Sequence, residues 1–124
     1  MPFNFTRRSA IATSAAALLA PSVAIAQEPT VHEVQMLNAD PENPRARQVF
    51  IHRVVVAQPG DTLKFIATDR GHNSEAIEEM IPAGAEVWEG AINEDIEVTL
   101  ETPGFYGYKC TPHATVGMVG LVIV

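Results

Sequence analysis

The chain has a single cysteine, Cys110, among its 124 residues. It therefore has no partner for an internal disulfide bond. In an oxidising compartment a lone thiol either bridges to another molecule, remains reactive or binds a metal. Basic residues are also scarce, because 8 Lys and Arg face 15 Asp and Glu, for a net charge of −7 with neutral histidines. That balance excludes the broad basic surface of a nucleic-acid-binding protein.

No apolar run is long enough to span a membrane. The alanine-rich stretch from Ile11 to Leu19 falls short of the roughly 20 residues that a spanning helix needs. It follows the paired arginines of Thr6-Arg7-Arg8 and precedes an Ala24-Ile25-Ala26 ending. This pattern predicts an export signal over residues 1–26 and no membrane anchor. The arginines leave the twin-arginine and the Sec routes open, and both lead to the bacterial periplasm.

The predicted mature chain, residues 27–124, has 98 residues, which suits one small domain with one core. Because Arg7 and Arg8 are removed, 6 basic residues remain against 15 acidic ones, and the net charge becomes −9. A protein this acidic is kept soluble by its charge, and it attracts basic partners. We expect it to be a monomer.

Apolar residues alternate with polar ones in several short segments. Leu63 and Phe65 alternate with Lys64, and the segment 96–101 shows the same period of two, as half-buried strands do. Turn residues at 58–61 and 102–104 bound these segments. We predict further strands at 31–36, 49–56, 105–110 and 116–124, the last buried on both faces because it is nearly all apolar. The predicted fold is an all-β, antiparallel Greek-key sandwich of about seven to eight strands.

Two local features complete this prediction. Ser74 begins a segment that ends at Pro82, and we predict a short helical turn there with Ser74 as its cap. Tyr106, Tyr108 and Cys110 alternate along one predicted strand, so their side chains should all point into the core. Tyr106 is predicted to form a tyrosine corner, in which the hydroxyl group bonds to a loop backbone.

Four residues suggest a metal site. Cys110 and His113 are separated by two residues, Met118 follows after four more, and His72 stands upstream in Gly71-His72-Asn73. A thiolate, two imidazoles and a weak axial thioether are the ligands of mononuclear blue copper. A short loop between adjacent strands would bring three of these side chains to one point, and His72 would come from a second loop. We predict one copper ion bound by His72, Cys110, His113 and Met118.

Three other interpretations remain open at this point. A structural zinc site also uses cysteine and histidine. A copper-delivery protein usually carries several exposed clusters of methionine or histidine, and only one compact ligand group is present here. A multicopper enzyme needs a second metal centre joined through histidines on both sides of the cysteine. Because Lys109 and Thr111 flank Cys110, we predict that the chain is not an enzyme.

The same loops resemble those of the pseudoazurins, small cupredoxins of the plastocyanin/azurin family. The resemblance covers about residues 34–124. It implies a cupredoxin sandwich that carries single electrons between periplasmic redox proteins as its copper cycles between Cu(II) and Cu(I). It also implies that Asn73 bonds to the cysteine loop, with Thr111 as its partner, and that electrons pass through the edge of His113. The segments that carry the resemblance are Gln58-Pro59-Gly60-Asp61, Gly71-His72-Asn73, Met80-Ile81-Pro82, Tyr108-Lys109-Cys110-Thr111-Pro112-His113 and Val116-Gly117-Met118.

The partners implied by the resemblance are c-type cytochromes or a periplasmic reductase such as nitrite reductase. In pseudoazurins lysines typically surround the docking patch, whereas Glu86 and Glu89 stand in that segment here, and Arg70 and Lys109 remain near the loops. We therefore expect an acidic border. The chain also ends at Val124, where pseudoazurins continue into two C-terminal helices, so we expect a short or truncated form.

Overall fold

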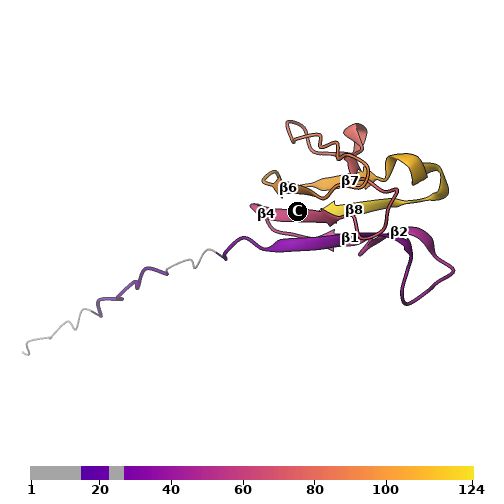
Figure 1. The fold of residues 1–124 in the computed structure, drawn as a ribbon. Coiled ribbons are helices and arrows are strands. Elements are labelled where there is room, and N and C mark those ends of the chain that lie inside the picture. Colours follow the sequence, from indigo (N-terminus) through magenta and orange to yellow (C-terminus); the bar gives the residue numbers. More distant parts are fainter. Residues whose placement is uncertain (1–14, 23–26) are drawn as a thin grey trace, which may run out of the picture.

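Two four-stranded sheets stack as the layers of a sandwich (Figure 1). The computed structural model describes residues 15–22 and 27–124; the rest of the predicted export signal, residues 1–14 and 23–26, lies outside the described part. Residues 15–22 are exposed and have no regular secondary structure. In the two described ranges, no helix is both long and apolar enough to cross a membrane.

The first sheet has the strand order β2-β1-β4-β6 and the second the order β3-β8-β7-β5. Strand β1 runs parallel to β4, and β3 runs parallel to β8. All other paired strands are antiparallel. The strands are β1 (Val31–Ala39), β2 (Arg47–Ile51), β3 (Val54–Val56), β4 (Asp61–Ile66), β5 (Glu75–Ala76), β6 (Ile96–Leu100), β7 (Phe105–Lys109) and β8 (Val119–Ile123).

The all-β sandwich predicted from the sequence is confirmed, and two of its details are corrected. The segment 49–56 is not one strand, because the chain leaves the first sheet after β2 and enters the second sheet at β3. The pairing is also not purely antiparallel, because each sheet contains one parallel pair. Alternation of apolar residues fixes which face of a strand is buried, but it does not specify the neighbouring strand or its direction.

The predicted helical turn after His72 is shorter than expected. Only η1 (Glu78–Met80) is helical, as a single 3₁₀ turn, and no side chain caps it. Ser74 is not the cap, because it lies buried where its hydroxyl oxygen accepts a hydrogen bond from Trp88 Nε1 at 3.0 Å. Strand β8 is also not buried on both faces, since only Val122 in it is fully buried. Part of its apolar outer face is exposed.

The core lies between the two sheets and is rich in aromatic rings. Phe50 and Phe65 pack edge-on against Tyr108, with ring centroids 5.0 and 4.9 Å away. Trp88 stacks on Phe65 at 6.0 Å. Tyr106, Tyr108 and Cys110 are all buried, as their alternation predicted. The tyrosine corner is confirmed as well, because the Tyr106 hydroxyl donates to the carbonyl oxygen of Thr102 at 2.6 Å.

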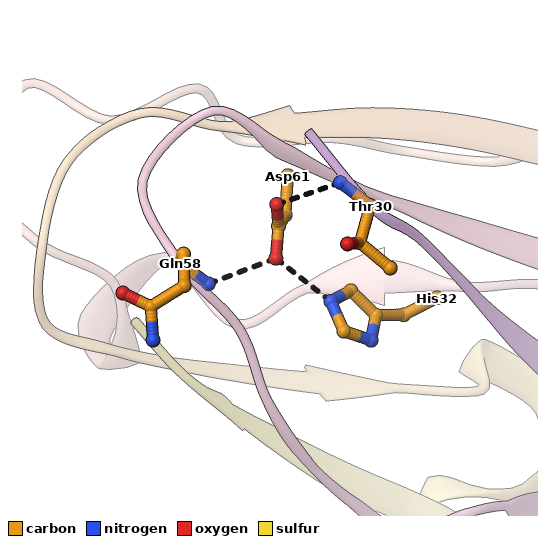
Figure 2. Close-up of polar contacts among 4 residues, drawn as sticks. All are labelled: Thr30, His32, Gln58 and Asp61. Atoms are coloured by element: carbon orange, nitrogen blue, oxygen red, sulfur yellow. Dashed lines mark hydrogen bonds and ion pairs between the residues drawn. The ribbon is translucent and has the colours of Figure 1, made fainter. Parts of the chain in front are cut away.

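A buried carboxylate fastens the beginning of β1 to the beginning of β4. Figure 2 shows Asp61 accepting hydrogen bonds from the backbone amides of Thr30 and Gln58, both at 2.9 Å, and contacting His32 Nε2 at 2.8 Å. The backbone hydrogen bonds from Gln58 and Thr30, followed by that of the His32 ring, lower the pKa of Asp61 from 3.8 to about 2. The folded protein therefore binds a proton here more weakly than the unfolded chain does.

We expect this carboxylate to stabilise the fold fully above about pH 4 and to lose that effect as the pH falls toward about 2. Asp61→Asn should lower the urea midpoint at pH 7 and flatten its dependence on pH between 4 and 2. Urea titrations across this range, followed by circular dichroism, test the prediction. Glu101→Gln, at an exposed acid, is the control and should leave both properties unchanged. An Asp61→Asn variant with the acid sensitivity of the parent would contradict the assignment.

Candidate metal centre

The loop between β7 and β8 holds three of the four predicted ligands at one end of the sandwich (Figure 1). Cys110 follows β7, His113 lies in the 3₁₀ helix η2 (Thr111–Val116), and Met118 precedes β8. The two strands are paired up to Lys109 and Val119, so Cys110 and Met118 come next and face each other. Cys110 N donates to the Met118 carbonyl oxygen at 3.0 Å, and Met118 N donates to that of His113 at 3.1 Å.

Gly117 gives this loop its compact shape. Its φ of +90° lies in the left-handed region, which glycine adopts without steric cost. Its amide donates to the Ala114 carbonyl oxygen at 3.0 Å, which closes η2 and turns the chain toward β8. The sequence therefore builds a short, tightly bonded loop with Cys110 and Met118 buried and His113 partly exposed.

His72 comes from the loop between β4 and β5, as predicted. Asn93 makes two hydrogen bonds to this loop. Its side-chain Oδ1 accepts from the backbone amide of Gly71 at 2.6 Å, and its own backbone amide donates to the His72 carbonyl oxygen at 2.9 Å. The His72 side chain is fully buried. Its ring centroid lies 4.9 Å from that of His113. Two loops that are far apart in sequence thus deliver their imidazoles to one place.

Two imidazole nitrogens converge on the Cys110 sulfur. The Sγ atom lies 3.7 Å from His72 Nδ1 and 3.4 Å from His113 Nδ1, and the ligand atoms of the three residues all lie within 4.8 Å of one another. A metal bonded to nitrogen and sulfur at about 2.0–2.3 Å, with angles of about 100–120°, separates these atoms by about 3.3–3.7 Å. The observed spacings fit a shared metal ion. Met118 is buried beside Cys110 across the strand pair, and its thioether suits copper.

Burial controls the protonation of the site. It lowers the pKa of His72, and the nearby His113 lowers it further, whereas Asp69 acts in the opposite direction. Burial also raises the pKa of the Cys110 thiol, and backbone hydrogen bonds from Asn73 and His113 partly oppose this. His72 is thus kept neutral, as a ligand must be, while the sulfur needs a bound cation to remain a thiolate in this buried position.

The two loops are joined by hydrogen bonds, as the resemblance implied. Asn73 Nδ2 donates to Thr111 Oγ1 at 2.8 Å, and Thr111 N donates to Asn73 Oδ1 at 2.7 Å. Sequence reasoning missed the next bond, in which the Thr111 hydroxyl donates to Glu75 Oε2 at 2.6 Å. It also missed Asn38, whose Oδ1 lies 2.8 Å from His72 Nε2.

The surface near the site differs from the prediction in one respect. Glu86 lines a hollow together with Glu101 and Tyr106. Tyr106 lies near the start of β7, whereas η2 follows the end of that strand. Glu86 therefore does not border His113. Glu89 does lie closer, because it forms a β-bridge with Glu75.

Comparisons with known proteins agree with this site. Residues 40–124 match the family model of copper binding proteins of the plastocyanin/azurin family. A pseudoazurin of Paracoccus pantotrophus is 46% identical over 114 residues, which cover 92% of this chain and 75% of the relative. The solved pseudoazurin of Methylobacterium extorquens AM1 is 40% identical with a TM-score of 0.71, over 76% of this chain and 74% of that one. That of Hyphomicrobium denitrificans is 37% identical with a TM-score of 0.72, over the same two shares.

The sandwich and its cluster of one cysteine and two histidines define a small copper protein with the cupredoxin fold. The chain belongs to the plastocyanin/azurin family of copper-binding proteins and resembles the pseudoazurins within it. Its cofactor is copper.

Proposed function

We propose that the chain is a periplasmic electron carrier that holds one type 1 copper through His72, Cys110, His113 and Met118. The observation that carries the proposal is the convergence of both Nδ1 atoms on Cys110 Sγ, at 3.7 and 3.4 Å. Copper, when bound, would accept and release one electron as it cycles between Cu(II) and Cu(I). The role of the protein is to hold the ligands in one arrangement, so that little atomic movement accompanies electron transfer.

The hydrogen bonds of the two loops support this role. Cys110, His113 and Met118 are tied to one another through their backbones, and Asn73 locks the His72 loop to Thr111. A site fixed in this way resists rearrangement when its charge changes. The Asn73 backbone also lowers the pKa of the Cys110 thiol, and backbone donors near a ligand sulfur stabilise its electron-rich form.

Copper delivery without electron transfer is less well supported. A protein that hands over its ion must let an acceptor reach the ligands. Here Cys110 and His72 have no exposed surface, and Met118 is 1% exposed. Only His113 among the four is partly exposed. This arrangement favours passage of an electron over release of the ion.

The exposed edge of His113 is the proposed point of electron exchange. Pro112 and Val116 are exposed beside it on η2, and Ala114 is half-buried. A small apolar rim of this kind suits the brief encounters of redox proteins. We propose c-type cytochromes or a periplasmic reductase such as nitrite reductase as partners, and a monomeric carrier.

The location and the domain boundaries belong to the same proposal. Residues 1–26 would be an export signal, by the twin-arginine or the Sec route, and residues 27–124 the copper-binding domain. The paired arginines, the apolar stretch and the Ala24-Ile25-Ala26 ending support this division. After removal of the signal the chain has a net charge of −9. This negative charge would attract basic soluble partners in the periplasm.

We expect electron transfer to a basic cytochrome to be fast at low ionic strength and to slow steeply as salt is added. Acidic side chains near the site, Glu75 and Glu89, attract such a partner, and salt screens them over a Debye length of about 10 Å at 0.1 M. Stopped-flow measurements at several salt concentrations test this. Glu89→Gln should lower the rate about twofold at low salt, whereas Glu86→Gln, the same charge change away from η2, should not.

The opposite outcome has a defined meaning. A rate that is indifferent to salt, or a preference for an acidic cytochrome that Arg70 and Lys109 govern, would contradict the acidic docking surface. Electron transfer to neither cytochrome by the copper-loaded protein would contradict the electron-carrier proposal itself.

A further inference from the structure

Glu75 is shared by the proposed docking surface and the hydrogen bonds of the metal centre. Its carboxylate oxygen Oε2 accepts a hydrogen bond from the Thr111 hydroxyl at 2.6 Å. Thr111 directly follows Cys110 and lies with His113 in η2. Glu75 is partly exposed, and Thr111 is exposed. A partner that covers the edge of His113 therefore lies against this hydrogen bond.

The negative charge of Glu75 is not compensated within the protein. Lys109 stands opposite Glu75 where β5 pairs with β7, and Glu89 faces it in a β-bridge. Even so, the only ion pair within residues 15–22 and 27–124 joins His32 and Asp61. Helix η1, which follows β5, adds two more acidic residues. The charge of Glu75 is therefore available to a cationic group of a partner.

The hydrogen bonds around Thr111 run in one direction. A carboxylate only accepts hydrogen bonds, so the Thr111 hydroxyl gives its single hydrogen to Glu75. Its oxygen then accepts from Asn73 Nδ2 at 2.8 Å, and Asn73 directly follows His72. Asn73 Nδ2 also donates to the Gly90 carbonyl oxygen at 3.0 Å. A chain of bonds thus leads from the residue beside the buried histidine, through the residue beside the cysteine, to a charged surface group.

A cation bound to Glu75 changes this chain of bonds. A hydrogen bond to a carboxylate is charge-assisted and roughly twice as strong as a neutral one, and the bonds of a chain polarise one another. A lysine or arginine of a partner competes for the same carboxylate, which weakens the hydrogen bond from the Thr111 hydroxyl. The hydroxyl oxygen is then less electron-rich, and the surroundings of both ligand loops become more positive.

We propose that Glu75 couples the docking of a basic partner to the copper site through Thr111 and Asn73. This inference rests on the proposed electron carrier and its basic partner. More positive surroundings favour Cu(I) over Cu(II), so docking raises the reduction potential. Because such coupling is reciprocal, the reduced protein binds the partner more tightly than the oxidised protein does. The partner that this surface fits is a basic electron donor, which finds a better acceptor once it has docked.

The test uses the full chain and a basic cytochrome c in which redox-inert zinc replaces the haem iron. Thr111→Val removes the hydroxyl and leaves every charge in place. Glu75→Gln keeps a hydrogen-bond acceptor and removes the charge. Glu89→Gln, the matched control, removes a neighbouring charge that is not part of the chain of bonds. Thr111→Val should keep the loops joined, because the backbone amide of residue 111 donates to Asn73 Oδ1 and Asn73 Nδ2 retains its bond to Gly90.

The first readout is the affinity of this cytochrome for the Cu(I) and Cu(II) forms at low salt, measured by titration calorimetry. The parent should bind about fivefold more tightly when it is reduced, and its reduction potential should rise on docking. Glu89→Gln should weaken both affinities and keep the fivefold ratio. In Thr111→Val and Glu75→Gln the ratio should fall to about twofold or less, which is the part that acts through space.

The second readout uses the metal-free protein and ¹⁵N NMR. Addition of the cytochrome should shift the Asn73 side-chain amide signals in the parent and in Glu89→Gln. In Thr111→Val and Glu75→Gln these signals should stay in place, although signals of exposed backbone amides in η2 still report docking. This comparison follows the effect of docking along the chain of bonds without any metal.

The outcomes separate this inference from the proposed function. If the parent gives no thiolate-to-copper band, the proposed function fails, while the NMR comparison still decides whether docking reaches Asn73. If the parent is blue and Thr111→Val keeps both the fivefold ratio and the Asn73 shifts, the coupling does not pass through Thr111 and the inference is wrong. Equal affinity of the blue parent in its two oxidation states, or no binding in either, would also overturn it.

Discussion

Replacing Cys110 by serine is expected to abolish the intense visible absorption of the copper-loaded protein. The band of a blue copper site arises from charge transfer between a thiolate and Cu(II), and Cys110 is the only cysteine in the chain. The variant should still fold, because serine is a little smaller than cysteine at this buried position. Visible spectra of parent and variant after addition of one equivalent of Cu(II) test the prediction.

Met118→Gln is the matched control for this experiment. An axial ligand adjusts the copper site but does not create its colour, so this variant should stay blue and show a lower reduction potential. Strong colour in Cys110→Ser would remove Cys110 from the site. Loss of all colour in Met118→Gln would show that the thioether has more than an axial, tuning role.

The second large effect is expected at Gly120, in strand β8 directly opposite Tyr108. A Cβ atom at position 120 would overlap the ring of Tyr108, which is fully buried against Phe50 and Phe65. The ring has little room to move, so Gly120→Ala should lower the free energy of unfolding by about 1–3 kcal/mol. Urea denaturation of the metal-free protein measures this change without interference from copper binding.

A double-mutant cycle shows whether the ring is the cause. Tyr108→Val alone should cost about 2–4 kcal/mol, because it leaves a cavity among the aromatic rings. In that background Gly120→Ala should be neutral or stabilising, since the added methyl group enters the vacated space. If the two changes are instead additive to within about 0.5 kcal/mol, the overlap with Tyr108 is not what destabilises Gly120→Ala.

Much of the metal centre could be predicted from the sequence because three of its residues lie within nine positions of one another. The spacing of Cys110, His113 and Met118 predicts a loop between adjacent strands, and β7 and β8 are such a pair. The alternation of Tyr106, Tyr108 and Cys110 likewise predicts their shared burial. In each case the information is local: a short loop or a period of two.

The features that were missed depend on contacts between distant segments. Asn38 meets His72 across 34 positions, and no pattern in the intervening sequence pairs them. The break between β2 and β3 was hidden for a related reason, since the two halves of one apolar segment join different sheets. Serine is a common helix cap, but the Ser74 hydroxyl oxygen instead accepts a hydrogen bond from Trp88. The helix also cannot begin there because Ala76 pairs with Tyr108 as part of a sheet.

The most direct test of the account is a titration of the metal-free protein with Cu(II), followed by visible absorption. The geometry of His72, Cys110 and His113 predicts an intense thiolate-to-copper band that grows in proportion to added copper and stops at one ion per chain. Reduction should bleach the band and oxidation should restore it, in a one-electron step. A colourless complex, or binding that continues well beyond one ion per chain, would contradict a single type 1 copper and with it the proposed electron carrier.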